Sequence, residues 1–135
     1  MVREELTRRG TPLRVLKYCE EELFRYGYFH AILESAKSVF DTLPRITGLD
    51  QDGAALADTA LSVKSGKLRI DSLATETERN EQNGFNSLVK AVAWMYRTPT
   101  VHDPRLNRSI SDTELYEALT LFSMIHRRLD EASVR

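Results

Sequence analysis

The segment FNSLVKAVAWMY, residues 85–96, decides the fold class of this chain. Apolar side chains recur in it at intervals of three and four residues, at Phe85, Leu88, Val89, Val92, Met95 and Tyr96. This is the spacing of one face of an α-helix. Pro99 follows closely, and a proline disfavours helical backbone in the residue before it. We therefore expect a helix that ends near Arg97.

Helical spacing also dominates on both sides of this segment. Thr11 and Pro12 form a typical helix start, and the helix that follows carries an apolar face of Leu13, Leu16, Leu23 and Phe24, flanked by Val15 and Cys19. After a break at Gly27, a second stripe runs through Phe29, Ile32, Ala36, Val39, Phe40 and Leu43, with its end expected between Pro44 and Gly48. A weaker helix is expected over residues 52–63.

The last helix opens with a capping-box pattern, Ser111 to Glu114. It carries an apolar stripe of Leu115, Leu119, Phe122, Ile125 or His126, and Leu129. Residues 64–81 are polar, and we interpret them as a long loop in which a short extended piece does not amount to a sheet. The sequence predicts one all-α domain over residues 1–135, a bundle of four to five helices with its core in residues 12–132.

Composition narrows the classes of function. The chain has 135 residues, of which 41% are hydrophobic and 29% charged, with a net charge of −1. This is ordinary for a globular protein, and no overall field attracts polyanions. Cys19 is the single cysteine, so a disulfide within the chain and a cysteine-rich metal site are excluded. The charged start and the lack of a 20-residue apolar run predict a cytoplasmic protein without a membrane segment.

Arg97 and His102 are the residues that best fit a chemical role. They lie five positions apart, at the expected helix end and in the loop behind it. Arginine suits phosphate recognition, and histidine transfers protons near neutral pH. Together they fit cleavage of RNA through its 2′-hydroxyl, a route that needs no metal ion. The alternative for His102 is a structural one, in which it caps the carbonyls of the preceding helix.

The order of motifs between Gln82 and Ala132 resembles that of a known protein family. The chain reads Gln82-Asn-Gly-Phe85, then the helix, then RTPTVHD from Arg97 to Asp103, and finally a last helix that ends in RRLD at residues 127–130. This order resembles the HEPN superfamily, in its Ymh-like, abortive-infection-type bacterial branch. The resemblance implies a helical bundle that forms a homodimer with a composite cleft. It also implies a metal-independent endoribonuclease of phage defence or toxin systems, with no cofactor.

The same resemblance implies roles for individual residues. Arg97 would bind the scissile phosphate and His102 would act as general acid or base. Thr98 stands where the family usually has asparagine, so a hydroxyl replaces an amide beside the arginine. Asp103, which follows the histidine, and Glu34 on the second helix are possible supporting residues; the alternative for Glu34 is an exposed surface carboxylate.

RNA contacts could extend beyond this pair. Arg105 and Arg108 follow His102 in the chain and could bind the RNA backbone, or could belong to a solvated loop. We expect Arg127 and Arg128 to stabilise the end of the last helix instead, where positive charge is favoured.

Three hypotheses of function remain open. The first is an endoribonuclease, acting on RNA rather than DNA, with an antitoxin or a defence protein as a possible partner. The second is a non-catalytic bundle of the same type that binds a nucleotide or a protein, as an interaction module. The third is a purely structural helical protein, which is what the chain would suggest without the match over residues 82–132.

Overall fold

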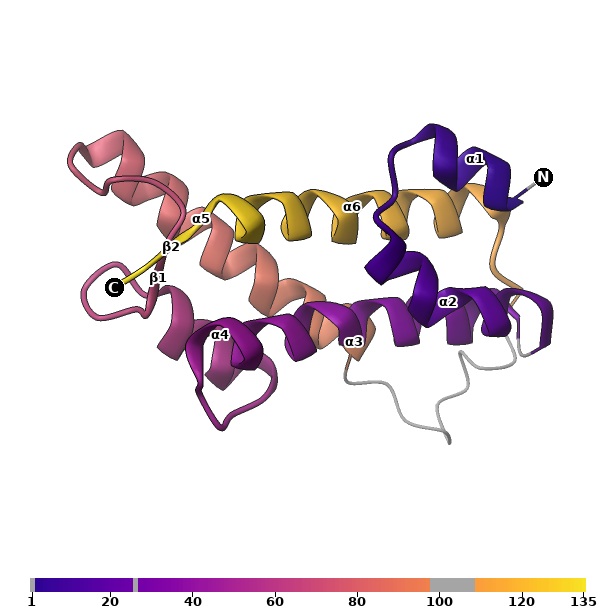
Figure 1. Ribbon diagram of the computed structural model, residues 1–135, viewed down its shortest axis with the longest axis horizontal. Helices are drawn as coiled ribbons and strands as arrows, with labels where there is room; N and C mark the ends of the chain where they lie inside the picture. Colours follow the sequence, from indigo (N-terminus) through magenta and orange to yellow (C-terminus); the bar gives the residue numbers. More distant parts are fainter. Residues whose placement is uncertain (1, 26, 98–108) are drawn as a thin grey trace.

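A computed structural model describes residues 2–25, 27–97 and 109–135, and for residues 21–25 it describes the backbone alone. The described residues form six α-helices, one π-helical segment and two very short strands (Figure 1). In chain order these are α1 (Val2–Arg8), α2 (Leu13–Arg25), α3 (Tyr28–Thr47), α4 (Gly53–Leu61), β1 (Leu68–Arg69), α5 (Glu76–Val92), η1 (Ala93–Arg97), α6 (Asp112–Glu131) and β2 (Ser133–Val134). The predicted all-α fold class is confirmed.

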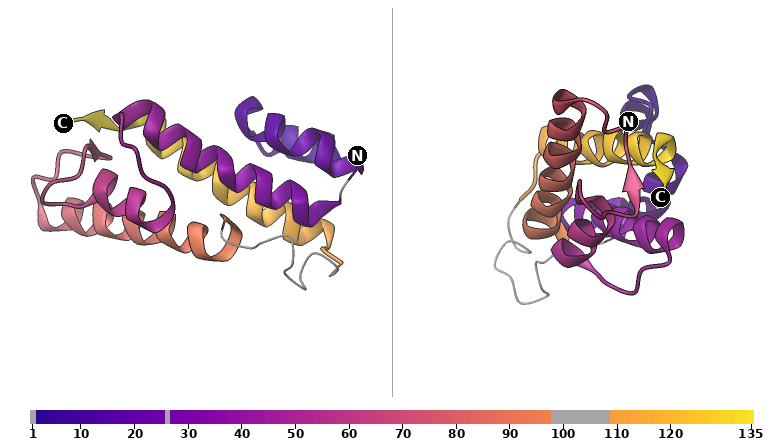
Figure 2. Two further views of the ribbon diagram at one scale, coloured as in Figure 1. Left: turned by 90° about the horizontal axis from the view of Figure 1, so that it is seen from below. Right: turned by 90° about the vertical axis from the view of Figure 1, so that its left-hand side faces the viewer.

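The two longest helices, α3 and α6, form the centre of the bundle. Each has 20 residues, and they pack against each other along the long axis of the molecule (Figure 1). In Figure 2, α1 and α2 lie on one side of this pair and α4 and α5 on the other. Since α3 also contacts η1, the end of η1 is positioned by the central helix.

The predicted apolar stripes form the core. Fully or nearly buried side chains include Ile32, Ala36, Val39, Phe40 and Leu43 of α3, Phe85, Val89 and Val92 of α5, and Leu115, Leu119, Phe122, Ile125, His126 and Leu129 of α6. Leu88 of α5 is partly buried, whereas Met95 of η1 is 56% exposed, although the predicted stripe included both.

Two residues of the predicted apolar stripes, Leu13 and Met95, are exposed. Leu13 is 76% exposed, whereas Val15, Leu16 and Cys19 are buried. Leu13 is the first residue of α2, and the buried face of the helix begins two residues later. The described core face of this helix therefore consists of Leu16, as predicted, together with Val15 and Cys19, which were predicted to flank the face.

Local capping explains the helix boundaries, including one that differs from expectation. Thr75 and Glu78 form a reciprocal capping box, so α5 begins at Glu76 and the predicted loop over residues 64–81 is shorter at its end. Pro44 lies inside α3, and the helix ends at Thr47, within the expected limits. The next residue, Gly48, has φ 75°, a left-handed conformation that glycine adopts readily.

Two elements were not expected from the sequence. The charged segment Val2–Arg8 forms α1 and buries Leu6 completely, so the core extends beyond the predicted limit at residue 12. Leu68 and Arg69 pair in antiparallel register with Val134 and Ser133. Among the helices of the described residues, none has the length and the apolar character needed to cross a membrane.

Candidate functional site

Arg97 is the last residue of η1, and its guanidinium remains partly accessible. The side chain is 33% exposed, and Nη2 donates a hydrogen bond to Oδ2 of Asp52 at 3.0 Å. The Nε atom is buried and has no hydrogen-bond partner within the described parts of the chain. A π-helical turn is rare and occurs often at functional sites. Among the described residues, Asp52 thus takes up only part of the donor capacity of Arg97.

Asp52 holds Arg97 from a different part of the chain. It is the N-cap residue of α4, and its Oδ1 accepts a hydrogen bond from the backbone N–H of Gly53 at 2.8 Å. Its side chain is 61% exposed. An ion pair this exposed contributes little to stability, about 0.2–1 kcal/mol. A phosphate group can therefore compete with Asp52 for the guanidinium.

The other predicted site residues divide into two groups. Thr98, His102, Asp103, Arg105 and Arg108 lie outside the described residues. Glu34 lies on α3, where it accepts a hydrogen bond from Lys37 Nζ at 2.6 Å and is 29% exposed. Within the described residues, Glu34 and Arg97 share no hydrogen bond or ion pair.

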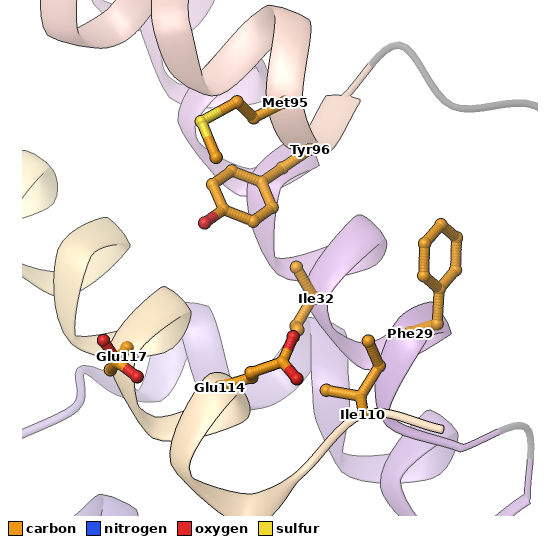
Figure 3. A pocket seen from close by; sticks show the side chains of 7 residues that line it. All are labelled: Phe29, Ile32, Met95, Tyr96, Ile110, Glu114 and Glu117. Atoms are coloured by element: carbon orange, nitrogen blue, oxygen red, sulfur yellow. The ribbon is translucent and has the colours of Figure 1, made fainter. Parts of the chain in front are cut away.

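A cavity of about 180 Å³ lies beside the end of η1 (Figure 3). Its described lining comes from three parts of the fold: Phe29 and Ile32 of α3, Met95 and Tyr96 of η1, and Ile110, Glu114 and Glu117 at the start of α6. In Figure 3 the two η1 side chains lie on one side and the two glutamates of α6 on the other. The cavity thus lies against the residues that precede Arg97 in η1, and it combines an apolar lining with carboxylates.

Tyr96 is held in place by the core. Its ring meets the ring of Phe122 edge to face, with the centroids 5.3 Å apart, a favourable geometry for aromatic pairs. The neighbouring Trp94 and Met95 are 66% and 56% exposed. The end of η1 therefore combines one anchored aromatic ring with two large apolar side chains on the surface.

Several residues that carry the sequence resemblance hold the bundle together. Arg128 of α6 pairs with Glu81 of α5, and Asp130 accepts two hydrogen bonds from Arg14 at 2.6 and 2.7 Å. Gln82 is fully buried and binds backbone groups between α4 and α5. Arg128, which was expected to stabilise the end of the last helix, thus pairs with a carboxylate of α5.

Two buried groups are unsuited to catalysis. His126 Nε2 lies 2.8 Å from Ser38 Oγ, but both residues are almost completely buried, and burial followed by the charge of Arg14 lowers the pKa of His126 to about 4. Burial also raises the pKa of the Cys19 thiol to about 11, so this thiol is not an activated nucleophile. Across the described residues, no group of three or more His, Cys, Asp or Glu side chains could hold a metal ion.

The sequence reasoning missed Glu114 and Glu117 as lining residues of a cavity. Glu114 was considered only as part of a capping box, of which one half is present, since Ser111 Oγ accepts from the backbone N–H of Glu114 at 3.1 Å. The available signal was their i,i+3 spacing, which places both on one side of a helix. That they face Tyr96 depends on tertiary packing.

Comparison with known proteins identifies a family but no characterised relative. A family model described as "Protein of unknown function (Hypoth_ymh)" matches residues 9–129, from the turn after α1 to the end of the core in α6. No curated protein matches the chain significantly, and no solved structure does. Since the match spans nearly the whole chain, this protein belongs to the Hypoth_ymh family.

Proposed function

We propose that this protein is a metal-independent endoribonuclease of the HEPN type, in which Arg97 binds the scissile phosphate and His102 transfers protons. The observation that carries the proposal is the state of Arg97. Its side chain is partly exposed, its partner among the described residues is the exposed carboxylate of Asp52, and the preceding residue, Tyr96, lines a cavity. The ordered motif from Gln82 to Asp130 supports the same assignment.

The ion pair with Asp52 explains how Arg97 can serve as a phosphate site. A phosphate accepts two parallel hydrogen bonds from a guanidinium, and such charge-assisted pairs are about twice as strong as neutral ones. The Asp52 pair uses one donor nitrogen. Moving the guanidinium from the carboxylate to a phosphate therefore gains a bond while it loses a weak surface contact.

The chemistry follows from the structure of RNA. The 2′-oxygen attacks phosphorus while its proton passes to a base, and the P–O5′ bond breaks as the leaving oxygen takes a proton from an acid. The products are a 2′,3′-cyclic phosphate and a 5′-hydroxyl. Arg97 would stabilise the negative charge that develops on the phosphorane, and His102 would supply one of the two proton transfers.

The proposal includes a homodimer with a composite cleft, because the resemblance pairs the motifs of two protomers. The proposal also includes a role in phage defence or as a toxin, with an antitoxin or a defence protein as partner. Mixing Arg97→Ala protomers with His102→Ala protomers tests the cleft directly. A composite site predicts that the mixture regains activity that each variant lacks alone, and a mixture without activity excludes shared sites.

A non-catalytic interaction module is the second candidate. The exposure of Trp94 and Met95 beside the cavity favours it, because large apolar side chains on a surface mark binding sites for other molecules. This candidate predicts ligand or partner binding with no change in RNA.

Cleavage of total cellular RNA by the purified protein in EDTA separates these candidates. Wild type is compared with an Arg97→Ala/His102→Ala double variant and with Arg127→Ala, which removes an exposed arginine from the far part of α6. The nuclease proposal predicts cleavage by wild type and Arg127→Ala, with loss in the double variant. Cleavage by all three proteins assigns the activity to another site or to a contaminant. No cleavage by wild type rejects the nuclease and favours the interaction module.

A further inference from the structure

We infer that the cavity beside η1 binds an unstacked guanine base of the RNA substrate, through the carboxylates of Glu114 and Glu117. This inference rests on the proposed function, because it assigns a base to the site whose phosphate contact is Arg97. It adds the substrate class, a single-stranded segment that contains guanine next to the cleaved bond.

The position of the cavity links it to Arg97. Tyr96 and Met95 line the cavity and precede Arg97 directly in η1, and Ile110 lines it from the start of the α6 segment. A nucleotide whose phosphate lies on Arg97 can therefore direct its base toward these side chains. The cavity is open at the surface and has an apolar part formed by Ile32 and Phe29 (Figure 3).

The aromatic part of the lining suits a base. Proteins recognise single-stranded RNA by stacking splayed-out bases on aromatic rings and by hydrogen bonding to their edges. Tyr96 is half-buried and braced against Phe122, so its ring is oriented before any ligand arrives. Phe29 adds a second ring from α3.

The carboxylates select among the four bases. A carboxylate only accepts hydrogen bonds, and guanine is the one base that presents two adjacent donors, N1–H and N2–H, on its Watson–Crick edge. Adenine, cytosine and uracil each place an acceptor next to their donor, so a carboxylate facing that edge meets repulsion. Glu114 and Glu117, three residues apart on α6 and across the cavity from Tyr96, thus favour guanine (Figure 3).

Binding of nucleoside 3′,5′-bisphosphates tests the inference without turnover. These probes carry a phosphate on either side of the sugar, so they report a base on either side of the cleaved bond. Methyl NMR in EDTA reports the place of binding, because Met95 lines this cavity and Met124 lines a separate cavity between α5 and α6. We expect the guanosine probe to shift the Met95 methyl signal at concentrations at least about tenfold lower than the other three probes, with Met124 unmoved.

Matched variants test the role of the carboxylates. Glu114→Gln and Glu117→Gln each remove a charge while they keep the shape of the side chain, and each is expected to reduce the guanosine preference. Glu131→Gln makes the same change on an exposed glutamate at the other end of α6 and is expected to retain it. Glu117 is exposed on its helix, so Glu117→Gln is a usable variant even if Glu114→Gln unfolds.

The outcomes separate this inference from the nuclease proposal. Guanosine-selective shifts without RNA cleavage support the base site and reject the nuclease. RNA cleavage that needs Arg97 but shows no guanine preference keeps the nuclease and overturns the base site. Equal binding of the four probes, or an unmoved Met95 signal, also overturns it. If argininamide shifts the Met95 signal at a lower concentration than the guanosine probe does, the two carboxylates bind a basic side chain instead of guanine.

Discussion

The guanidinium of Arg97 and the carboxylate of Asp52 join the end of η1 to the start of α4, across 45 positions of sequence. One oxygen of Asp52 accepts from Arg97 at 3.0 Å, and the other accepts from the backbone N–H of Gly53 at 2.8 Å. The same carboxylate thus caps α4 and pairs with Arg97, the residue proposed to bind phosphate. Any anion that binds Arg97 must therefore compete with Asp52, which also serves as the N-cap of α4.

Asp52→Asn is expected to separate these two roles. The amide oxygen of asparagine can still cap α4, because Asn and Asp are equally good N-cap residues. The charge that competes for Arg97 is lost, so we expect tighter binding of a short single-stranded RNA, with stability changed by less than about 1 kcal/mol. Fluorescence anisotropy at low salt measures the affinity, since salt screens such contacts.

Asp50→Asn is the matched control, because it removes an exposed negative charge two residues away. An equal gain in affinity for both variants would trace the effect to net charge rather than to Arg97. Asp52→Ala also removes the cap, and a further loss of about 0.5–2 kcal/mol in unfolding free energy is expected.

Gln82 provides a second prediction, on stability. Its Oε1 accepts from the backbone N–H of Ile70 at 2.9 Å, and its Nε2 donates to the carbonyls of Leu61 and Leu68, each at 2.9 Å. Gln82→Glu keeps the size but replaces the donor by an oxygen that faces two carbonyls. Since an unsatisfied buried group costs about 1–3 kcal/mol, we expect a loss of at least that size in urea unfolding. Gln51→Glu, on an exposed residue, is expected to change stability by less than about 0.5 kcal/mol; similar losses in both variants would contradict the role of Gln82.

The elements that could be predicted are those that local spacing determines. The stripes around Phe85 and Phe122 follow a helical period, and they are buried as expected except at Met95, which is 56% exposed, and at Leu88 and Tyr96, which are partly buried. Helix α1 escaped prediction because it has seven residues and one buried apolar side chain, Leu6. A helix this short depends on tertiary packing rather than on its own sequence. The two-residue strand that begins at Leu68 likewise depends on its partner strand, Ser133–Val134, which lies far away in the sequence.

The candidate site was predictable in part for the same reason. Arg97 was placed at a helix end because Pro99 lies two residues beyond it, and that is local information. Its partner Asp52 and the cavity between Tyr96 and Glu114 depend on contacts between separate helices, which spacing along one helix does not contain.

Gly84 gives a third prediction, because nothing in the described fold requires a glycine there. It lies inside α5, and a Cβ built on it meets no atom within 4 Å. Gly84→Ala is therefore expected to stabilise the protein by about 0.4–1 kcal/mol in thermal or urea unfolding. Gly66→Ala is the contrasting variant, since its Cβ would lie 2.5 Å from the carbonyl oxygen of Ser62, and it is expected to destabilise. A destabilised Gly84→Ala protein would mean that another surface packs closely on α5.

The buried pair of His126 and Ser38 determines which ring nitrogen carries hydrogen. The Ser38 hydroxyl donates its proton to the carbonyl of Ser35 at 2.6 Å, so toward His126 its oxygen can only accept. His126 is therefore the Nε2–H tautomer. Its Nδ1 has no hydrogen-bond partner among the described residues. Nitrogen chemical shifts of the ring, with Nε2 protonated at pH 7, check this assignment.

The same histidine makes stability depend on pH. Burial, reinforced by the positive charge of Arg14, lowers the pKa of His126 from 6.5 to about 4. Between these values the unfolded chain binds a proton that the folded protein excludes, so stability falls as pH drops from about 6.5 to about 4, by up to about 1.4 kcal/mol per pH unit. His126→Gln keeps a donor for Ser38 and does not titrate. Urea unfolding at pH 7, 6 and 5 should therefore show a steeper loss for wild type than for the variant. Carboxylates that do not interact with His126 cancel in the difference, whereas Asp130, which interacts with it electrostatically, contributes to that difference. Parallel curves would mean that His126 is not held neutral by the core.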